Sequence, residues 1–342
     1  MSDHAGIAST AEATEAGAHP LLQVDEVHVR FRVRKPHGFG HQMLHAVDGV
    51  SLQVQRGRTL GLVGESGCGK STLGRAILGL QAPESGRVLF EGKDLVRMPE
   101  SERRAYRREM QIVFQDPYSS LDPRMTIHDI VAEPLRIHGI YSAARVRHMM
   151  EVVGLATSME VRRPDAFSGG QRQRVAIARA LALQPKLLVL DESVSALDVS
   201  IRAQILNLLR QLQREFGLAY LFISHDLSVI RHMSHQVAVM YMGRIVESGT
   251  REQVFDSAAH PYTRSLLSDV PIDDPSLRAG SRRILLAGDP PDPLQLPSGC
   301  AFRSRCFKSR PECSVVTPEL ARRAGTAGQL SACHVPDEMP AH

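Results

Sequence analysis

Residues 59–71 of this chain are Thr-Leu-Gly-Leu-Val-Gly-Glu-Ser-Gly-Cys-Gly-Lys-Ser, an apolar run followed by a glycine-rich loop. The apolar run predicts a short strand, and the loop is expected to open a helix. Residues 64–71 match the spacing G-x-x-x-x-G-K-S, which surrounds phosphate oxygens with backbone N–H groups when it lies between a strand and a helix. A glycine-rich turn with a chance lysine is the alternative, and the agreement of strand, loop and helix disfavours it. The stretch therefore predicts an α/β fold with a phosphate-binding loop.

The residue types in this loop suit a nucleoside triphosphate with magnesium. The Lys70 ammonium is a mobile charge for the β- and γ-phosphates, and the Ser71 hydroxyl is suited to Mg²⁺. The following helix adds free N–H donors and the positive end of its dipole. Cys68 is expected to be a small filler rather than a nucleophile. The predicted ATP-binding residues of this segment are Gly64, Glu65, Ser66, Gly67, Cys68, Gly69, Lys70, Ser71 and Thr72.

A second apolar run, residues 187–190, ends in two carboxylates, Asp191 and Glu192. The continuous run is typical of a parallel strand covered on both faces. Ligands of open α/β sheets bind at the carboxyl ends of such strands. Asp191 is therefore expected to hold Mg²⁺. Glu192 points the other way along the strand and is expected to orient and polarise the attacking water. The alternative is a pair of solvated charges at a strand end.

Strands and helices alternate along much of the chain, as in an α/β sheet. Apolar residues that alternate with polar ones near the N-terminus predict an antiparallel β region in addition. The predicted elements are strands at 27–33, 50–54 and 220–223, a helix over 201–212, a mostly helical stretch at 101–161 and a β-hairpin at 240–249.

Composition and charge limit the function. The 342 residues include 23% charged and 5% aromatic residues and no Trp, and this length allows about two domains. A formal net charge of +4 is too small to indicate a nucleic-acid partner. No run approaches the ~18 consecutive apolar residues of a membrane span. Residues 1–20 lack the features of a signal peptide and are expected to be a disordered leader. We therefore expect a cytosolic chain that reaches a membrane only through partners.

Residues 167–171, Phe-Ser-Gly-Gly-Gln, separate this chain from other phosphate-binding proteins. The serine is a good helix N-cap, and the two glycines permit close approach by another backbone. This second helix N-terminus is suited to an anion. The stretch resembles the signature of the ABC ATPases, which implies a head-to-tail dimer. The phosphate loop of one subunit and the signature of its partner would close on one ATP. The signature residues are Ser168, Gly169, Gly170 and Gln171.

Further motifs follow in the order of the ABC family. The resemblance implies that Gln115 contacts Mg²⁺ and the attacking water, that Asp198 contacts the opposite ATP site and that His225 contacts the γ-phosphate. Phe31 is the candidate for stacking on adenine, although core packing explains a strand Phe equally well. At Ser193 many relatives have Pro, but neither carboxylate is lost and we expect activity to survive. The predicted catalytic residues are Glu192, His225 and Gln115, and the predicted Mg²⁺ ligands are Ser71, Gln115 and Asp191.

The resemblance also implies an architecture, that of a P-loop NTPase of the ABC cassette type. A RecA-like parallel sheet core, an antiparallel β subdomain and a helical subdomain at about 101–180 would form a nucleotide-binding domain at 21–255. After Arg251 proline and glycine become frequent. Residues 256–342 are therefore expected to form a small loop-rich C-terminal extension.

Four cysteines lie near one another in this extension, at Cys300, Cys306, Cys313 and Cys333. Their spacing alone leaves metal binding and free packed thiols as even alternatives, because no pair has the C-x₂-C spacing of zinc ribbons. Residues 260–263 and 297–306 resemble the C-terminal region of oligopeptide and dipeptide importer ATPases, and 115–126 is also characteristic of them. That resemblance implies a structural [4Fe–4S] cluster on the four cysteines, with one Zn²⁺ as the alternative.

The resemblance to these importer ATPases covers nearly the whole chain after about Leu22. It implies ATP hydrolysis that powers peptide import. The implied partners are a second ABC ATPase subunit, two transmembrane permeases and an extracytoplasmic binding protein, with this chain peripheral at the cytoplasmic face of the inner membrane. Nickel or opines are alternative cargoes. An ABC ATPase acting on nucleic acid is the other alternative. Such chains carry a long coiled coil between phosphate loop and signature, whereas here the interval is about a hundred residues without sustained heptads.

Overall fold

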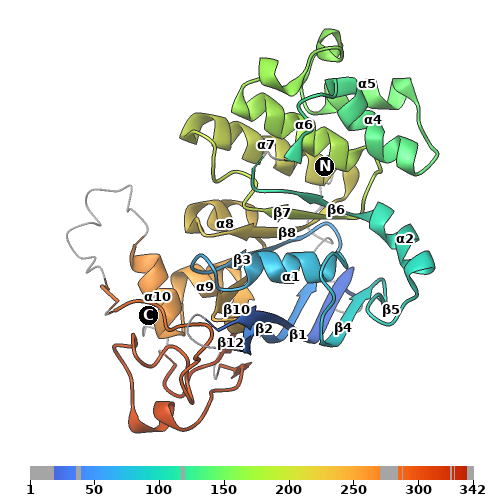
Figure 1. Cartoon of the computed structure of the whole chain (residues 1–342). Helices are drawn as coiled ribbons and strands as arrows, with labels where there is room; N and C mark the ends of the chain where they lie inside the picture. Colours follow the sequence, from blue (N-terminus) through green and yellow to red (C-terminus); the bar gives the residue numbers. More distant parts are fainter. Residues whose placement is uncertain are drawn as a thin grey trace, which may run out of the picture.

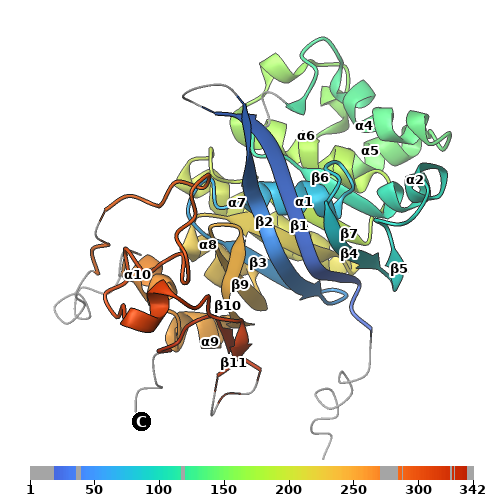
Figure 2. The same cartoon turned by 60° about the horizontal axis from the view of Figure 1, so that its bottom comes forward.

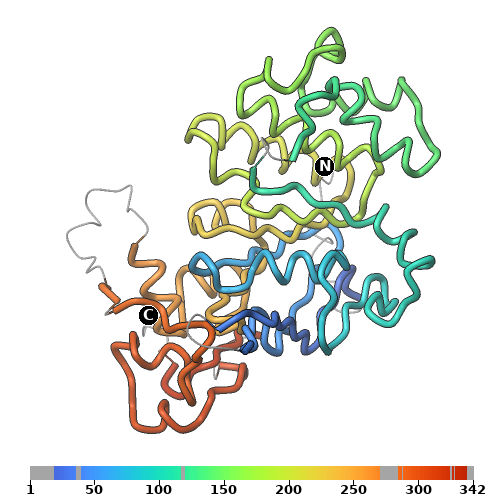
Figure 3. The backbone as a smooth tube through the Cα atoms, in the orientation of Figure 1, coloured from blue at the N-terminus to red at the C-terminus, as the bar shows by residue number. Residues whose placement is uncertain are grey.

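The computed structural model describes most of the chain. The described residues are 19–35, 40–116, 120–269, 284–286, 288–323, 326 and 328–336. The predicted leader at 1–20 lies outside them, apart from His19 and Pro20. Figures 1 and 3 show a cluster of helices at one end, sheets in the middle and the C-terminal coil at the other end. Among the described helices, none is long and apolar enough to cross a bilayer.

An eight-stranded sheet forms the centre of the molecule, with the order β11-β12-β10-β9-β3-β8-β7-β6. Strands β9, β3, β8, β7 and β6 run parallel, and the remaining neighbours pair antiparallel. Every residue of β3, β7 and β8 is buried, as expected of apolar strands covered on both faces. This parallel core confirms the predicted α/β fold. The strands are β3 Thr59–Val63, β6 Met110–Val113, β7 Leu187–Asp191, β8 Ala219–Ser224, β9 Gln236–Tyr241, β10 Arg244–Thr250, β11 Ala321–Arg322 and β12 Leu330–Ser331.

A second sheet is antiparallel and has the order β2-β1-β4-β5. Its strands are β1 Leu22–Arg34, β2 His41–Val54, β4 Ser85–Phe90 and β5 Lys93–Asp94. The predicted alternation holds, because Val27 and Val29 are buried and His28 between them is partly exposed. The long β1–β2 pair crosses the front of Figure 2. Within this ladder Phe31 lies opposite Leu44.

Helix α1 (Lys70–Ile77) contacts strands of both sheets, β1 and β2 on one side and β7 and β8 on the other (Figure 1). Nearby, β9 and β10 form the predicted hairpin. Its two turn residues, Met242 and Gly243, have φ values of +46° and +81°. Tight turns with positive φ at both central residues match the twist of paired strands. The hairpin brings this turn beside the phosphate loop, since Gly243 N–H donates to the Cys68 carbonyl at 2.9 Å.

Helices precede and follow β6 along the chain, the first lying beside β6 and the later ones forming the cluster at the far end of the sheet (Figures 1 and 3). They are α2 Glu100–Glu109, α4 Ile127–Ile137, α5 Ala143–Val152 and α6 Gly169–Leu181, with the 3₁₀ turns η1 Thr157–Met159 and η2 Pro164–Ala166. Helices α4, α5 and α6 pack on one another. The stretch 101–161 is largely helical as predicted, but β6 interrupts it. Met110 and Val113 of β6 are buried where the strand pairs with β7.

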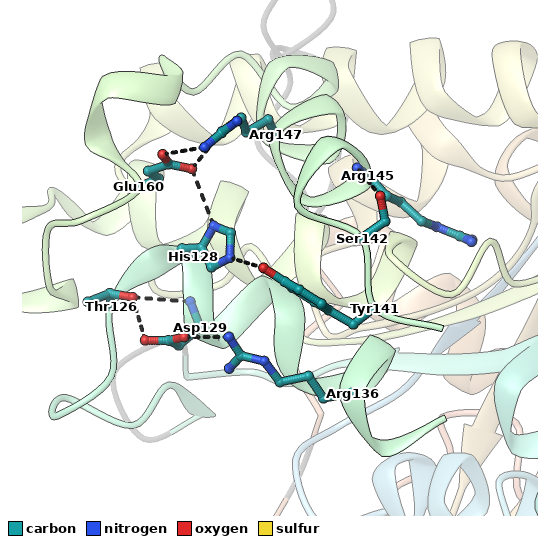
Figure 4. A network of polar contacts seen from close by, with 9 residues as sticks. All are labelled: Thr126, His128, Asp129, Arg136, Tyr141, Ser142, Arg145, Arg147 and Glu160. Atoms are coloured by element: carbon teal, nitrogen blue, oxygen red, sulfur yellow. Dashed lines mark hydrogen bonds and ion pairs between the residues drawn. The ribbon is translucent and has the colours of Figure 1, made fainter. Parts of the chain in front are cut away.

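Polar contacts connect α4 and α5 with the turn that follows them (Figure 4). The Glu160 carboxylate accepts hydrogen bonds from the Arg147 guanidinium at 3.1 and 3.2 Å. The same carboxylate lies 3.2 Å from Nδ1 of His128, whose Nε2 lies 3.1 Å from the Tyr141 hydroxyl. Such partly exposed pairs contribute little stability each. Their effect here is to fix how these helices lie relative to one another.

The remaining helices complete the core and lead to the C-terminal coil. They are α7 Val199–Phe216, α8 Leu227–Met233, α9 Arg251–Asp256 and α10 Pro261–Ser268, with the 3₁₀ turn η3 Pro311–Ser314. The coil after residue 288 adds β12 to the edge of β10 (Figures 1 and 2). The buried Glu247 of β10 joins these parts. Its carboxylate accepts N–H donors of Ala259, His260 and Gln329 at 2.7, 2.9 and 2.8 Å.

Candidate active site

A cavity of about 300 Å³ lies at the phosphate loop. The loop supplies residues 66–72, and three predicted residues from elsewhere in the chain also line the cavity: Phe31, Gln115 and Glu192. The structure therefore brings together residues from β1, the end of β6, α1 and the end of β7. Sequence reasoning missed the other lining residues, which are Leu44, His45, Ala46, Met242, Gly243 and Pro293.

The phosphate loop is shaped by backbone that packs against its glycines. A Cβ added to Gly64 would lie 2.1 Å from the Met240 carbonyl oxygen, and one added to Gly69 would lie 2.1 Å from that of Ala46. Gly69 also has φ +108°, which favours glycine. The buried Lys70 ammonium donates to the Gly64 carbonyl at 2.8 Å and to the next carbonyl at 2.9 Å. Backbone of both sheets thus packs against the loop, and the Lys70 ammonium lies inside it.

Asp191 and Ser71 form the pair that is suited to a cation. The Ser71 hydroxyl donates to the Asp191 carboxylate at 2.8 Å. Burial raises the pKa of the Asp191 carboxyl, and the hydrogen bond from Ser71 opposes that rise only in part. A buried carboxylate whose hydrogen-bond partner is neutral is stabilised by a bound cation. Hydroxyl and carboxylate oxygens are the donors that Mg²⁺ prefers, so these residues fit the ion.

Glu192 is the centre of the predicted catalytic set. The Gln115 amide donates to one of its carboxylate oxygens at 2.9 Å, and Nδ1 of His225 lies 3.3 Å from the other. The Glu192 backbone has φ +47°, a conformation that costs energy in a non-glycine residue and clusters at functional sites. It is held by a hydrogen bond from the Glu192 N–H to the Ile223 carbonyl at 3.0 Å. Three separate chain segments therefore meet at this carboxylate.

The signature segment is well formed but lies elsewhere. Ser168 caps α6 in a capping box with Gln171. A Cβ on Gly170 would lie 2.5 Å from Cγ2 of Ile201, whereas one on Gly169 would meet only Leu197, at 3.6 Å. Gly170 therefore serves packing inside this chain. Gly169 leaves room, and a close approach by another molecule is possible there.

Asp198 also lies away from the cavity. It is exposed and precedes α7. Among the described residues that line the cavity, none belongs to the signature or is Asp198. Within one chain the structure thus assembles the phosphate loop with Gln115, Glu192 and His225, and it leaves the signature and Asp198 on a separate surface.

The C-terminal cysteines do not form the predicted metal centre. In the described part of the chain, which includes all four of them, no group of three or more His, Cys, Asp or Glu side chains is placed to hold a metal ion. The predicted [4Fe–4S] cluster and its zinc alternative are therefore wrong. The free thiols are Cys300, Cys306, Cys313 and Cys333, together with Cys68.

Two protein families match parts of the chain. Residues 47–195 match the family described as ABC transporter, and residues 246–313 match the C-terminal region of oligopeptide and dipeptide transporters. The first match contains the phosphate loop, Gln115, the signature and Glu192. The second contains α10 and the first three cysteines of the coil.

Curated relatives resemble almost the full chain. The putative oligopeptide transport ATP-binding protein YkfD of Bacillus subtilis is 46% identical, over 92% of this chain and 95% of its own length. OppF of Escherichia coli, an oligopeptide transport ATP-binding protein, is 50% identical over 90% and 95%. DppF of the same organism, a dipeptide transport ATP-binding protein, is 46% identical over 96% and 98%.

Solved structures resemble the cassette portion. CbiO1 of Clostridium perfringens, part of the ABC transporter complex cbiONQ, has a TM-score of 0.59 and 28% identity, over 70% of this chain and 91% of its own. The dimeric structure of MJ0796, a bacterial ABC transporter cassette, has a TM-score of 0.59 and 26% identity, over 67% and 98%. These likenesses agree with the fold described above.

Proposed function

Because this chain belongs to the ATP-binding subunits of ABC transporters, in the oligopeptide and dipeptide group, we propose that its ATPase activity powers the import of di- and oligopeptides. The single observation that carries the proposal is the meeting of Gln115 and His225 at the Glu192 carboxylate, beside the phosphate loop. That arrangement is suited to activating a water molecule next to a terminal phosphate. The transport names of the full-length relatives support peptides as the cargo.

The site residues expected from the sequence have the following proposed roles. The phosphate loop and Lys70 bind the triphosphate, and Phe31 stacks on the adenine. Ser71, Asp191 and Gln115 hold Mg²⁺, which neutralises charge on the phosphates when bound. Glu192 orients the attacking water and takes up its proton, while His225 holds the carboxylate and contacts the γ-phosphate. Catalysis by this set consists of positioning and charge stabilisation.

We propose that a second cassette subunit completes the site. The signature residues Ser168 to Gln171 and Asp198 lie outside this chain's own cavity, which supports a contact with nucleotide on the partner. ATP bound between two cassettes would close the pair, and hydrolysis would release it. Coupled permeases would convert that cycle into alternating access.

The remaining partners follow from the same proposal. Two transmembrane permeases and an extracytoplasmic binding protein would complete the importer, with this chain peripheral at the cytoplasmic face of the membrane. Nickel and opines are alternative cargoes that use similar systems. The weak net charge of +4 gives no support to a nucleic-acid substrate.

Glu192→Gln tests the role at the centre of the site. We expect this variant to bind MgATP as the wild type does and to lose ATP hydrolysis by about 10²-fold or more, because the amide cannot accept a proton from water. Nucleotide binding and phosphate release are measured on the same preparation. Glu215→Gln, an exposed glutamate of α7, is the matched control and retains hydrolysis. Undiminished turnover in Glu192→Gln would refute the assigned role.

A further inference from the structure

Glu65, the second residue of the phosphate loop, is bound by the C-terminal part of the chain. Its carboxylate accepts hydrogen bonds from the Arg305 guanidinium at 3.0 and 2.9 Å, across 240 positions of sequence. Its backbone N–H donates to the Tyr262 hydroxyl at 2.9 Å. The Arg305 side chain is only 8% exposed. Surface ion pairs are normally exposed to solvent. This pair is largely shielded from it and lies on the loop that is expected to bind phosphate, so a role at that loop is the better explanation.

Both residues of the C-terminal part that contact Glu65 are anchored by one packed aromatic cluster: Tyr262 belongs to it, and Arg305 lies three residues after its member Phe302. Tyr262 of α10 is fully buried, and its ring centre lies 4.6 Å from that of Tyr241 and 5.3 Å from that of Phe302. Arg305 follows Phe302 in the coil, and its N–H donates to the Phe302 carbonyl at 3.0 Å. The cluster is therefore a rigid support, since packed aromatic side chains have few alternative rotamers.

The charges explain why such a support matters to this loop. A carboxylate beside a triphosphate repels it, and the repulsion is larger where water is partly excluded. The Arg305 guanidinium neutralises Glu65 through one nitrogen, Nη1, which contacts both oxygens of the carboxylate. The neighbouring Glu65 carbonyl accepts from the Lys70 ammonium at 2.9 Å. A rotation of Glu65 would therefore move the carbonyl that positions this lysine.

We propose that Arg305, with Tyr262, is a positioning residue that holds the phosphate loop in shape and cancels the charge of Glu65, so that the C-terminal coil sets the affinity for MgATP. This inference rests on the proposed binding of ATP at the loop. It assigns to the coil a direct action on the nucleotide site. Pro293 of the same coil lines the cavity, which agrees with that action.

A double-mutant cycle tests the proposal in the full-length chain, with the dissociation constant of MgATP as the readout. We expect Arg305→Gln to weaken binding about tenfold, because it leaves the Glu65 carboxylate unpaired on the loop that is proposed to bind the phosphates. Glu65→Gln removes the charge that Arg305 cancels, so its own dissociation constant is the reference for the double variant. The double variant should then bind like Glu65→Gln alone. Arg305→Lys, which keeps the charge and replaces the planar guanidinium by an ammonium, should lie between the wild type and Arg305→Gln.

If Arg305 acts by cancelling the charge of Glu65, adding Glu65→Gln to Arg305→Gln should restore MgATP binding. If Arg305 is only needed for folding, it should not. A defect in folding caused by losing the buried guanidinium would persist in the double variant, and thermal unfolding of each variant monitors it. Arg303→Gln is the matched control, since Arg303 bonds to Ser298 and Ser314 of the same coil. Wild-type affinity in Arg305→Gln, or equal weakening in the single and double variants, would overturn the proposal. Failure of the wild type to bind MgATP would instead contradict the proposed function.

Discussion

At the scale of single residues, Asp191 and Glu192 are neighbours in sequence with different surroundings. The Asp191 side chain is buried and accepts the Ser71 hydroxyl. Glu192 leaves the strand with positive φ and meets Gln115 and His225. The alternation of side chains along a strand predicted two directions for the two carboxylates. The left-handed turn at Glu192 was not predictable, because it depends on the hydrogen bond to Ile223 of the next strand.

The raised pKa of Asp191 gives a pH-dependent prediction. Burial places this pKa above the ordinary value of 3.8, so the folded chain binds the proton more tightly than the unfolded chain does. The destabilisation caused by the charged form is therefore absent at low pH and develops as pH rises through the raised pKa. We expect Asp191→Asn, without magnesium at pH 7, to unfold at a higher temperature than the wild type.

The same substitution should weaken the response to magnesium. MgATP is expected to raise the unfolding temperature of the wild type, less so as pH falls towards the raised pKa and a proton competes with the cation. In Asp191→Asn the affinity for ATP should depend less on Mg²⁺ than in the wild type, because Ser71 and Gln115 remain. Asp256→Asn, at an exposed carboxylate of α9, is the control and behaves as the wild type. An Asp191→Asn variant that is less stable without magnesium and responds to it as strongly as the wild type would contradict this account.

At the scale of elements, α6 shows two neighbouring glycines with different tasks. Gly170 gives space to Ile201 of α7, and Gly169 faces open space apart from Leu197. Val199 at the start of α7 is 80% exposed, an unusual position for a large apolar side chain beside a functional motif. The first turn of α6 and the start of α7 are therefore the surface that we expect a partner cassette to cover.

Replacing each glycine by alanine tests which one serves packing inside the chain and which one serves contact with a second cassette. Gly170→Ala should destabilise the chain by about 1–3 kcal/mol, the usual cost of overpacking a core, because the new Cβ overlaps Ile201. Gly169→Ala should keep the wild-type unfolding temperature, since alanine is tolerated in a helix, and should lose ATP-dependent association. Thermal unfolding and the mass in solution with MgATP distinguish the two. Gly169→Ala molecules that pair as readily as the wild type would exclude the signature from the contact.

An element can be predicted from the sequence when its own residues form a recognisable apolar pattern. Strands β3, β7 and β8 are buried along their whole length, so each appears in the sequence as an apolar run. Strand β6 has only four residues, two of them buried, and follows a charged helix, so it was hidden in a stretch predicted as helical. The two-residue β12 has no periodicity at all. The pairing of Arg305 with Glu65 joins residues 240 positions apart and leaves no pattern in either segment.

The candidate site was predicted more completely than the C-terminal coil. Phosphate-loop, strand-end and signature motifs have fixed spacings, and Phe31, Gln115 and Glu192 line one cavity with the phosphate loop. Cysteine spacing does not fix a geometry. The four thiols of the coil pack without a metal-binding arrangement in the described residues, so composition alone was misleading there.

At the scale of the whole molecule, three parts surround the nucleotide cavity. The antiparallel sheet supplies Phe31, the parallel sheet supplies the phosphate loop and Glu192, and the C-terminal coil supplies Pro293 and the support of Glu65. The signature on α6 contributes to none of these. On the proposed function, the chain would carry one half of an ATP site at the cavity and the complementary half on another surface.

The most direct test of this account is the mass in solution of the Glu192→Gln variant, alone and mixed with the companion cassette subunit of the same transporter, with and without MgATP. Slow hydrolysis should trap the closed pair, so we expect particles of two cassettes with MgATP and single chains after the magnesium is chelated. Single chains in every mixture, at ATP concentrations that saturate the phosphate loop, would contradict an ATPase formed by two cassette subunits.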